Sequence, residues 1–130
     1  MIVADAKDEA ALTAMAARTK VVVSTVGPYA LYGDTLVKVC AESGTHYCDL
    51  TGEAQWIRKM QERHEDTARK SGAMIVHRCG FDSIPSDLGV HFVQKYAQKK
   101  FGQICNRIDM RVAKIKGVAF DLPYLSQWTS

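Results

Sequence analysis

Residues 20–53 read KVVVSTVGPYALYGDTLVKVCAESGTHYCDLTGE, and the rest of the chain is interpreted outward from this stretch. Its first segment, 21–26, is an apolar run rich in β-branched valine, which is typical of a buried strand. The run does not alternate with polar residues, so it predicts a parallel sheet that is covered on both faces. Gly27 and Pro28 then end the strand.

A helix and a second strand follow this turn. Asp34 is placed to cap the helix, and Gly44 is placed to end it. The second strand is expected at 46–50, which completes a strand–helix–strand unit of an α/β fold. Because ligands of open α/β sheets bind outside the carboxyl ends of the strands, we expect a small-molecule site near 26–29 and 49–53.

The flanking sequence continues this alternation of helices and strands, as judged from apolar periodicity and from capping residues. The further expected elements are the end of a strand at 1–5, a helix capped by Asp8, a helix at 54–71 ended by Gly72, a strand from 73 to about 79, and a helix from Ser86 or Asp87 to about Lys99.

The pattern changes at 104–112, where apolar and polar residues alternate almost strictly. Such alternation predicts a half-exposed strand of antiparallel type rather than a strand covered on both faces. We therefore expect two domains, a nucleotide-type α/β domain at 1–102 and the start of a second, antiparallel-sheet domain at 103–130.

Composition excludes several classes of function. The net charge of the 130 residues is only +3, and the densest basic run, Lys95, Lys99 and Lys100, lies on one expected helix. A solvated helical face explains that run better than a nucleic-acid surface does, so no nucleic-acid partner is predicted. No segment approaches the roughly 20 apolar residues of a membrane helix, and no signal peptide is recognisable.

The four cysteines contain no CxxC pair, which favours small buried side chains in a reducing, intracellular compartment. His46-x-Cys48 and His77-x-Cys79 are isolated pairs, so no metal site is predicted. Asp82, in the segment GFDSIPSDLG at 80–89, has two interpretations that both remain open. It is part of a helix entry, or it faces the ligand cleft as an acid or base.

Three segments in the same order resemble the saccharopine dehydrogenase-like oxidoreductases, a group that includes the mycobacterial trans-acting enoyl reductases. They are VVVSTVGPYALYG, HYCDLTGE and CGFDSIPSDLG, and the resemblance extends over roughly residues 2–112. It implies a Rossmann-like NAD(P)-binding domain with a parallel sheet, followed by a second domain that contains a large antiparallel sheet.

The resemblance also implies cofactor-binding residues. Gly27, Pro28 and Tyr29 match the strand-end loop that would lie beside the nicotinamide ribose, where a glycine allows close approach of the backbone. Asp5 matches the acidic residue that would lie by the adenine end, and a simple turn residue is the alternative interpretation. Asp49, Glu53 and Asp82 occupy further matched positions to which we assign no role, and no catalytic residue is identified.

The sequence departs from the family pattern in one respect. None of its nine glycines is separated from another by a single residue, so the G-x-G-x-x-G turn that holds the pyrophosphate is absent. The chain therefore resembles the second half of the nucleotide domain, as a fragment would. We expect it to bind NAD(P) poorly and to be inactive alone.

The function that the resemblance implies is hydride transfer, in the intact protein, between NAD(P) and a small or lipid-like substrate. The alternative is a non-catalytic Rossmann-like binding or scaffold protein associated with lipid metabolism. A homodimer through the second domain is possible in this family. The expected location is the cytoplasm or the periphery of lipid-droplet or mitochondrial membranes.

Overall fold

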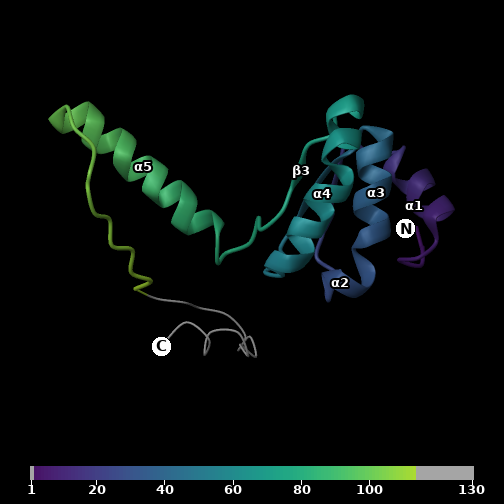
Figure 1. The fold of residues 1–130 in the computed structure, drawn as a ribbon. Helices are drawn as coiled ribbons and strands as arrows, with labels where there is room; N and C mark the ends of the chain where they lie inside the picture. Colours follow the sequence, from purple (N-terminus) through teal and green to yellow (C-terminus); the bar gives the residue numbers. More distant parts are fainter. Residues whose placement is uncertain (1, 114–130) are drawn as a thin grey trace. The chain divides into compact units, whose positions relative to one another are not determined.

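The computed structural model describes residues 2–113 of the chain, in which helices and strands alternate (Figure 1). The elements are α1 (Glu9–Ala16), β1 (Val21–Ser24), α2 (Tyr29–Tyr32), α3 (Asp34–Ser43), β2 (His46–Asp49), α4 (Ala54–Ser71), β3 (Ile75–Val76) and α5 (Ile84–Phe101). The chain divides into two compact units, 1–92 and 93–130, which are described separately.

The first unit contains a parallel sheet with the strand order β1-β2-β3. Val21 pairs with His46 and Ser24 pairs with Asp49, so β1 and β2 end at the same level. Tyr47 pairs with Ile75 on the other side of β2. The predicted α/β fold with a parallel sheet is confirmed.

One face of the sheet packs against α3 and α4, which lie next to one another in Figure 1. Tyr47 of β2, Val37 of α3 and Met60 of α4 are almost fully buried there. Tyr29 and Trp56 close the same cluster, with their ring centroids 5.5 Å apart. Burying each large apolar side chain contributes about 1.5–3 kcal/mol, so this cluster is the main stabilising element of the first unit.

A second cluster holds α1 against α3 through Leu12, Ala16 and Val39. The predicted N-cap of α1 is confirmed, because the amide of Ala11 donates to Oδ1 of Asp8 at 3.0 Å. This cap satisfies one of the amides that have no partner inside the helix.

The opposite face of the sheet differs from expectation. In the described part of the chain, Val21, Val23 and Val76 alternate with residues that are partly or fully buried, and they are 47%, 63% and 51% exposed. The prediction that both faces are covered is therefore wrong for these residues. An apolar run indicates only that a strand can be buried on both faces. Whether a face is covered depends on helices from other parts of the fold.

Helix boundaries follow the predictions in part. Gly44 and Gly72 end α3 and α4 in the left-handed conformation, with φ of 74° and 81°, as glycine at this position should. The prediction that Asp34 caps α3 is wrong, because Gly33 holds the cap position and Asp34 is the first helical residue. The side chain of Asp34 instead accepts a bond from Trp56 Nε1 at 2.6 Å.

Two other boundaries were also predicted wrongly. α5 begins at Ile84, before Ser86 and Asp87, because Pro85 fits the first turn of a helix, where its missing N–H is not needed. Within the described residues, 2–5 form no strand and lie outside the sheet, whose strands are β1, β2 and β3.

In the second unit, 103–113 contains no strand. Both side-chain groups of Gln94 on α5 bond the backbone of Cys105, with Nε2 donating to its oxygen at 2.9 Å and Oε1 accepting from its amide at 2.8 Å. The side-chain amide of Gln94 thus satisfies the backbone N–H and C=O of Cys105, which a neighbouring strand would otherwise bond. The rest of the proposed antiparallel domain, from 114 onward, lies outside the described residues, and that domain stays a prediction.

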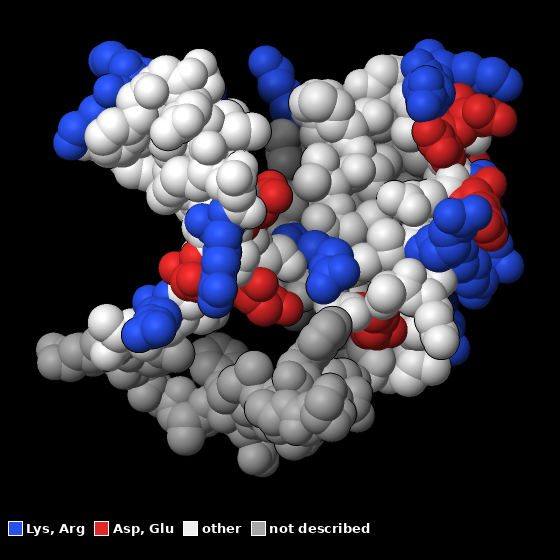
Figure 2. Space-filling model, turned by 60° about the vertical axis from the view of Figure 1, so that its left-hand side comes forward, with Lys and Arg blue, Asp and Glu red and all other residues white. Residues whose placement is uncertain are grey.

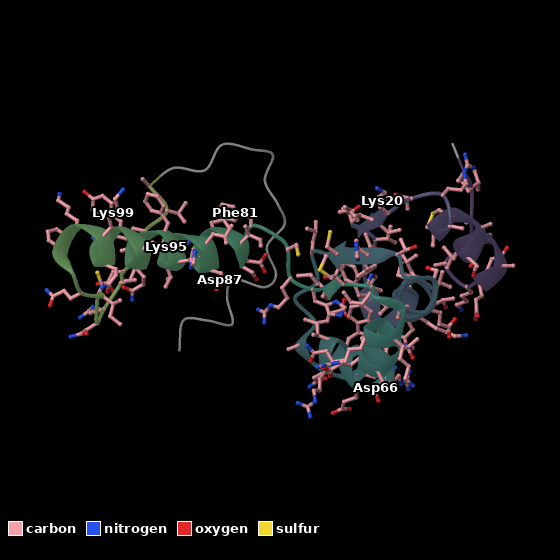
Figure 3. All side chains as sticks on the ribbon, turned by 90° about the horizontal axis from the view of Figure 1, so that it is seen from above. Lys20, Asp66, Phe81, Asp87, Lys95 and Lys99 are labelled. Carbon is pink, nitrogen blue, oxygen red and sulfur yellow. The ribbon has the colours of Figure 1, made fainter. Side chains whose placement is uncertain are left out.

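Charged side chains are mixed in sign. On the face displayed in Figure 2, acidic and basic side chains lie side by side, and on α4 Arg58 pairs with Glu62 and Arg69 pairs with Glu65, both at 2.6 Å. Lys95 and Lys99 lie on α5, the single helix expected for them (Figure 3). Exposed pairs of this kind contribute little to stability.

Candidate functional site

The carboxyl ends of the strands meet around the carboxylate of Asp49, the last residue of β2, which is fully buried. Its Oδ1 accepts from the amides of Thr51 and Arg78, both at 3.1 Å. Its Oδ2 accepts from the hydroxyl of Tyr47 at 3.1 Å and lies 2.7 Å from Nδ1 of His77. One side chain thus joins β2, the loop after β2 and the end of β3.

These partners keep Asp49 ionised. Burial alone would raise the pKa of this carboxyl group, but the bond from His77 and the amides of Thr51 and Arg78 outweigh burial, so the pKa lies below its ordinary value. Because an ionised carboxylate only accepts hydrogen bonds, Nδ1 of His77 carries the proton that the two share.

The end of β3 is shaped by the same carboxylate. Arg78 has a φ of 63°, which non-glycine residues rarely adopt, and its amide points to Asp49. The next amide, of Cys79, donates to the backbone oxygen of Asp49 at 2.7 Å. The chain then turns at Gly80, whose oxygen accepts from Ile84 at 2.9 Å as α5 begins.

The loop after β1 is fastened to the loop after β2 by Glu53. The carboxylate of Glu53 accepts from the amide of Tyr29 at 2.7 Å and from the amide of Ala30 at 2.9 Å, at the start of α2. The hydroxyl of Tyr29 donates to the oxygen of Ser24 at 3.0 Å and accepts from the amide of Leu50 at 3.3 Å. The two strand ends are therefore held in one fixed arrangement.

We expect Glu53→Gln to lower the free energy of unfolding by about 1.5 kcal/mol. The glutamine side chain keeps one acceptor oxygen for one backbone N–H of α2, and the second backbone N–H loses its charged acceptor. Urea titration followed by circular dichroism measures the change. Glu62→Gln on α4, the helix that Glu53 precedes, is the matched control, since within the described residues Glu62 pairs only with the exposed Arg58. An equal, small effect of both variants would show that Glu53 does not hold the loop.

The predicted cofactor-binding residues have different surroundings. Gly27 and Pro28 are exposed and joined by a cis peptide bond, and Tyr29 is buried. These three lie in the loop that Glu53 holds, one strand away from Asp49. Asp5 lies in an exposed turn, where its Oδ1 accepts from the amide of Lys7 at 2.8 Å. No recorded contact joins Asp5 to the strand ends within the described residues.

Sequence reasoning missed His77 and the partners of Asp34. His77 follows β3 by one residue, at the same edge as Asp49, and this position after a strand was the available signal. The carboxylate of Asp34 accepts hydrogen bonds from three side chains of α4. The donors are Nε1 of Trp56, Nζ of Lys59 and Nη1 of Arg63, the last two at 3.2 Å. The three donors lie on one face of α4, but no sequence spacing connects that face with Asp34, which lies on α3. Asp82 is exposed in the turn before α5.

Within 2–113, no helix has the length and apolar content needed to cross a bilayer. No group of three or more His, Cys, Asp or Glu side chains in that range is arranged to hold a metal ion. The four cysteines are free, and only Cys40 is fully buried; burial raises the pKa of its thiol to about 11.

Comparison of the sequence with known proteins identifies relatives of this chain. Residues 1–76 match the saccharopine dehydrogenase NADP binding domain. The chain is 47% identical over 95 residues to a lipid droplet localized protein of Caenorhabditis elegans. It is 46% identical over 107 residues to a trans-acting enoyl reductase of Mycobacterium leprae, and 50% identical over 99 residues to a putative trans-acting enoyl reductase of Mycobacterium tuberculosis.

These alignments cover 73%, 82% and 76% of this chain, but only 22%, 26% and 24% of the three relatives. The chain thus spans about a quarter of the length of the curated relatives it matches. No solved structure matches the chain significantly. The predicted resemblance is confirmed, and the chain belongs to the saccharopine dehydrogenase NADP binding domain family.

Proposed function

We propose that the edge formed by Gly27, Pro28 and Tyr29 and by the end of β2 contacts the ribose and nicotinamide of NADP. In the whole protein this edge would serve hydride transfer to or from a small or lipid-like substrate. The observation that carries the proposal is the loop after β1, which sits at the carboxyl end of a parallel strand and is held there by the carboxylate of Glu53.

Gly27 supports this placement. A Cβ atom added at Gly27 would make only ordinary contacts, the nearest being Cε2 of Tyr29 at 3.6 Å, and its φ does not require glycine. Nothing within the described chain therefore explains the missing side chain. Close approach of a ligand to the exposed backbone does explain it.

The protein's own residues would position and shield the cofactor, which supplies the hydride. The hydroxyl of Tyr29 is hydrogen-bonded to the backbone of Ser24 and Leu50, and it would fix the position of the loop relative to the strand ends. The exposed carboxylate of Asp5 would lie toward the adenine end of NADP. The alternative is that Asp5 is a simple turn residue. Asp49 is fully buried with its oxygens occupied, so we assign it to holding the strand ends rather than to proton transfer.

We expect valine at the position aligned with Gly27 in the Mycobacterium tuberculosis relative to weaken NADPH binding at least tenfold, since two methyl groups would occupy the space of the ribose. Calorimetric titration measures the affinity. Thermal melting of the same variant is the control, because the open surroundings of Gly27 predict little change in stability. Unchanged NADPH affinity would show that this loop is structural only.

The name of the Caenorhabditis elegans relative favours a second candidate, a non-catalytic binding protein at the surface of lipid droplets. That function would need neither cofactor turnover nor a hydride acceptor. NADPH oxidation and flotation with phospholipid-coated triacylglycerol droplets, both measured on the Mycobacterium tuberculosis relative, separate the two. Flotation without oxidation supports the binding protein, and oxidation that depends on an added unsaturated acyl substrate supports the oxidoreductase.

A further inference from the structure

Two of the four free cysteines lie at the carboxyl end of neighbouring strands. Cys48 belongs to β2, and Cys79 follows β3 by three residues, so both lie in the first unit. The residue that faces Cys48 across the ladder is Val76, the last residue of β3. The two cysteines are far apart in the sequence, but the sheet brings their chain segments next to one another.

The backbone holds Cys79 against β2. The amide of Cys79 donates to the backbone oxygen of Asp49, the residue after Cys48, at 2.7 Å. The Sγ atom of Cys79 lies 3.6 Å from the backbone oxygen of Val76, which is the ladder partner of Cys48. Neighbouring strands lie about 4.8 Å apart, and the Cα atoms of a disulfide are usually about 4.4–6.8 Å apart. A disulfide can therefore span the separation of these two segments.

The two thiols also act on one another. Burial first, and then the charge of Cys48, raise the pKa of the Cys79 thiol, and a hydrogen bond between the two side chains acts in the same direction. A neighbouring charge shifts a pKa mainly within about 4–6 Å. These effects agree with the backbone contacts in placing the two side chains close together.

Both cysteines are partly open to solvent within the described chain. Cys48 and Cys79 are each partly exposed, whereas Cys40 is fully buried. In the ladder, Cys48 lies between Val23 and Val76, which belong to the exposed face of the sheet. A small oxidant therefore has access to this pair that it does not have to Cys40.

We propose that Cys48 and Cys79 are a site of reversible oxidation, at which a peroxide converts the two thiols into a disulfide. The thiolate of Cys48 attacks one oxygen of hydrogen peroxide, the O–O bond breaks, and Cys48 becomes a sulfenic acid while one water leaves. The sulfur of Cys79 then attacks the sulfur of Cys48, the S–S bond forms, and the sulfenic hydroxyl leaves as a second water. Each water takes up one thiol proton, and two electrons pass from the sulfur atoms to the peroxide.

The order of these steps follows from the environment of Cys79. The thiolate is the nucleophile, so the raised pKa of Cys79 makes Cys48 the first thiol to react. Once Cys48 is an uncharged sulfenic acid, its charge no longer raises the pKa of Cys79, which favours the second attack.

The disulfide would fasten the turn after β3 to the end of β2. It would close a loop that contains all of α4, and closing a long loop stabilises a fold by restricting its unfolded state. Disulfides in reducing compartments are usually transient and redox-sensing, so a reversible bond suits the compartment expected from the sequence. The site is separate from the loop proposed to contact NADP, and its oxidation requires no cofactor.

The test treats the full 130-residue chain with an equimolar amount of hydrogen peroxide, blocks the remaining thiols with iodoacetamide and maps disulfides by mass spectrometry. Cleavage after Lys, Arg and Glu places Cys48 in peptide 43–53 and Cys79 in peptide 79–95, separate from Cys40 and Cys105. We expect these two peptides to be joined and to separate again in dithiothreitol. The oxidised chain should melt roughly 10 °C above the reduced chain.

Three variants locate the effect. Cys48→Ser and Cys79→Ser should each abolish the joined peptides and the difference in melting temperature. Cys105→Ser removes a partly exposed thiol of the second unit and should preserve both. Separate peptides in the unchanged oxidised chain, a sulfinic acid at Cys79 without a bond to Cys48, or a lower melting temperature of the oxidised chain would each overturn the proposal. The peptide map needs no variant, so it decides the matter even where Cys48→Ser does not fold.

Discussion

Replacing Asp49 with alanine is expected to lower the free energy of unfolding by about 3–5 kcal/mol, the largest effect of any single change considered for this chain. The carboxylate accepts four hydrogen bonds from three parts of the first unit. Its removal would leave two backbone amides, a phenol and an imidazole without their acceptor in a buried place. Small domains have only about 5–15 kcal/mol of total stability, and this change would remove a large share of it.

Urea titration measures this change, and Asp66→Ala is its matched control. Asp66 lies on α4 and is exposed, with no recorded hydrogen-bond partner within the described residues (Figure 3). Surface substitutions of this kind change stability by no more than about 0.5 kcal/mol. Equal stabilities of the two variants would show that the strand ends are held together without Asp49.

The same carboxylate predicts a pH dependence. The pKa of Asp49 is lowered in the folded chain relative to an unfolded aspartate, whose pKa is about 3.9. Its stabilisation is therefore fully present above about pH 4 and is lost as pH falls through the lower, folded value. Stability measured from pH 7 downward should decline in this acid range, and Asp49→Asn should decline less. Parallel curves for the two proteins would contradict the assignment.

Replacing Gly33 with alanine is expected to lower the free energy of unfolding by about 3 kcal/mol, since overpacking typically costs about 1–3 kcal/mol and this position has no room to relax. A Cβ atom there would lie 2.5 Å from Cζ2 of Trp56 and 2.8 Å from the backbone oxygen of Tyr29. The oxygen belongs to α2 and cannot move aside, so Trp56 would have to leave its place against Tyr29.

Thermal melting and tryptophan fluorescence report this change together, because displaced Trp56 becomes solvated. Gly52→Ala is the matched control, since nothing lies within 4 Å of a Cβ atom added there. An unshifted emission spectrum and a melting temperature equal to that of Gly52→Ala would show that the close contact at Gly33 does not constrain the fold.

The sequence by itself determined the elements whose signals are local. The signals are the valine run at 21–23, the glycines that end α3 and α4, and the aspartate that caps α1. Each acts on its own neighbours, so each could be recognised from a few residues. The parallel arrangement followed because a strand–helix–strand unit has essentially one way to close. The family followed from three ordered segments around the strand ends.

The tertiary structure alone decided which side chains meet. Asp34 was expected to cap its own helix, yet its carboxylate binds Trp56, 22 residues away, because the indole N–H of Trp56 and the charged Lys59 and Arg63 on the facing helix outcompete the local amide. Glu53 joins Tyr29 across 24 residues, and Asp49 joins His77 across 28. Such contacts depend on the register of the strands and on how the helices pack against one another. Neither can be read from the spacing of residues in a sequence. For the same reason, the buried Nε2 of His77, which has no hydrogen-bond partner within the described residues, became apparent only in the folded chain.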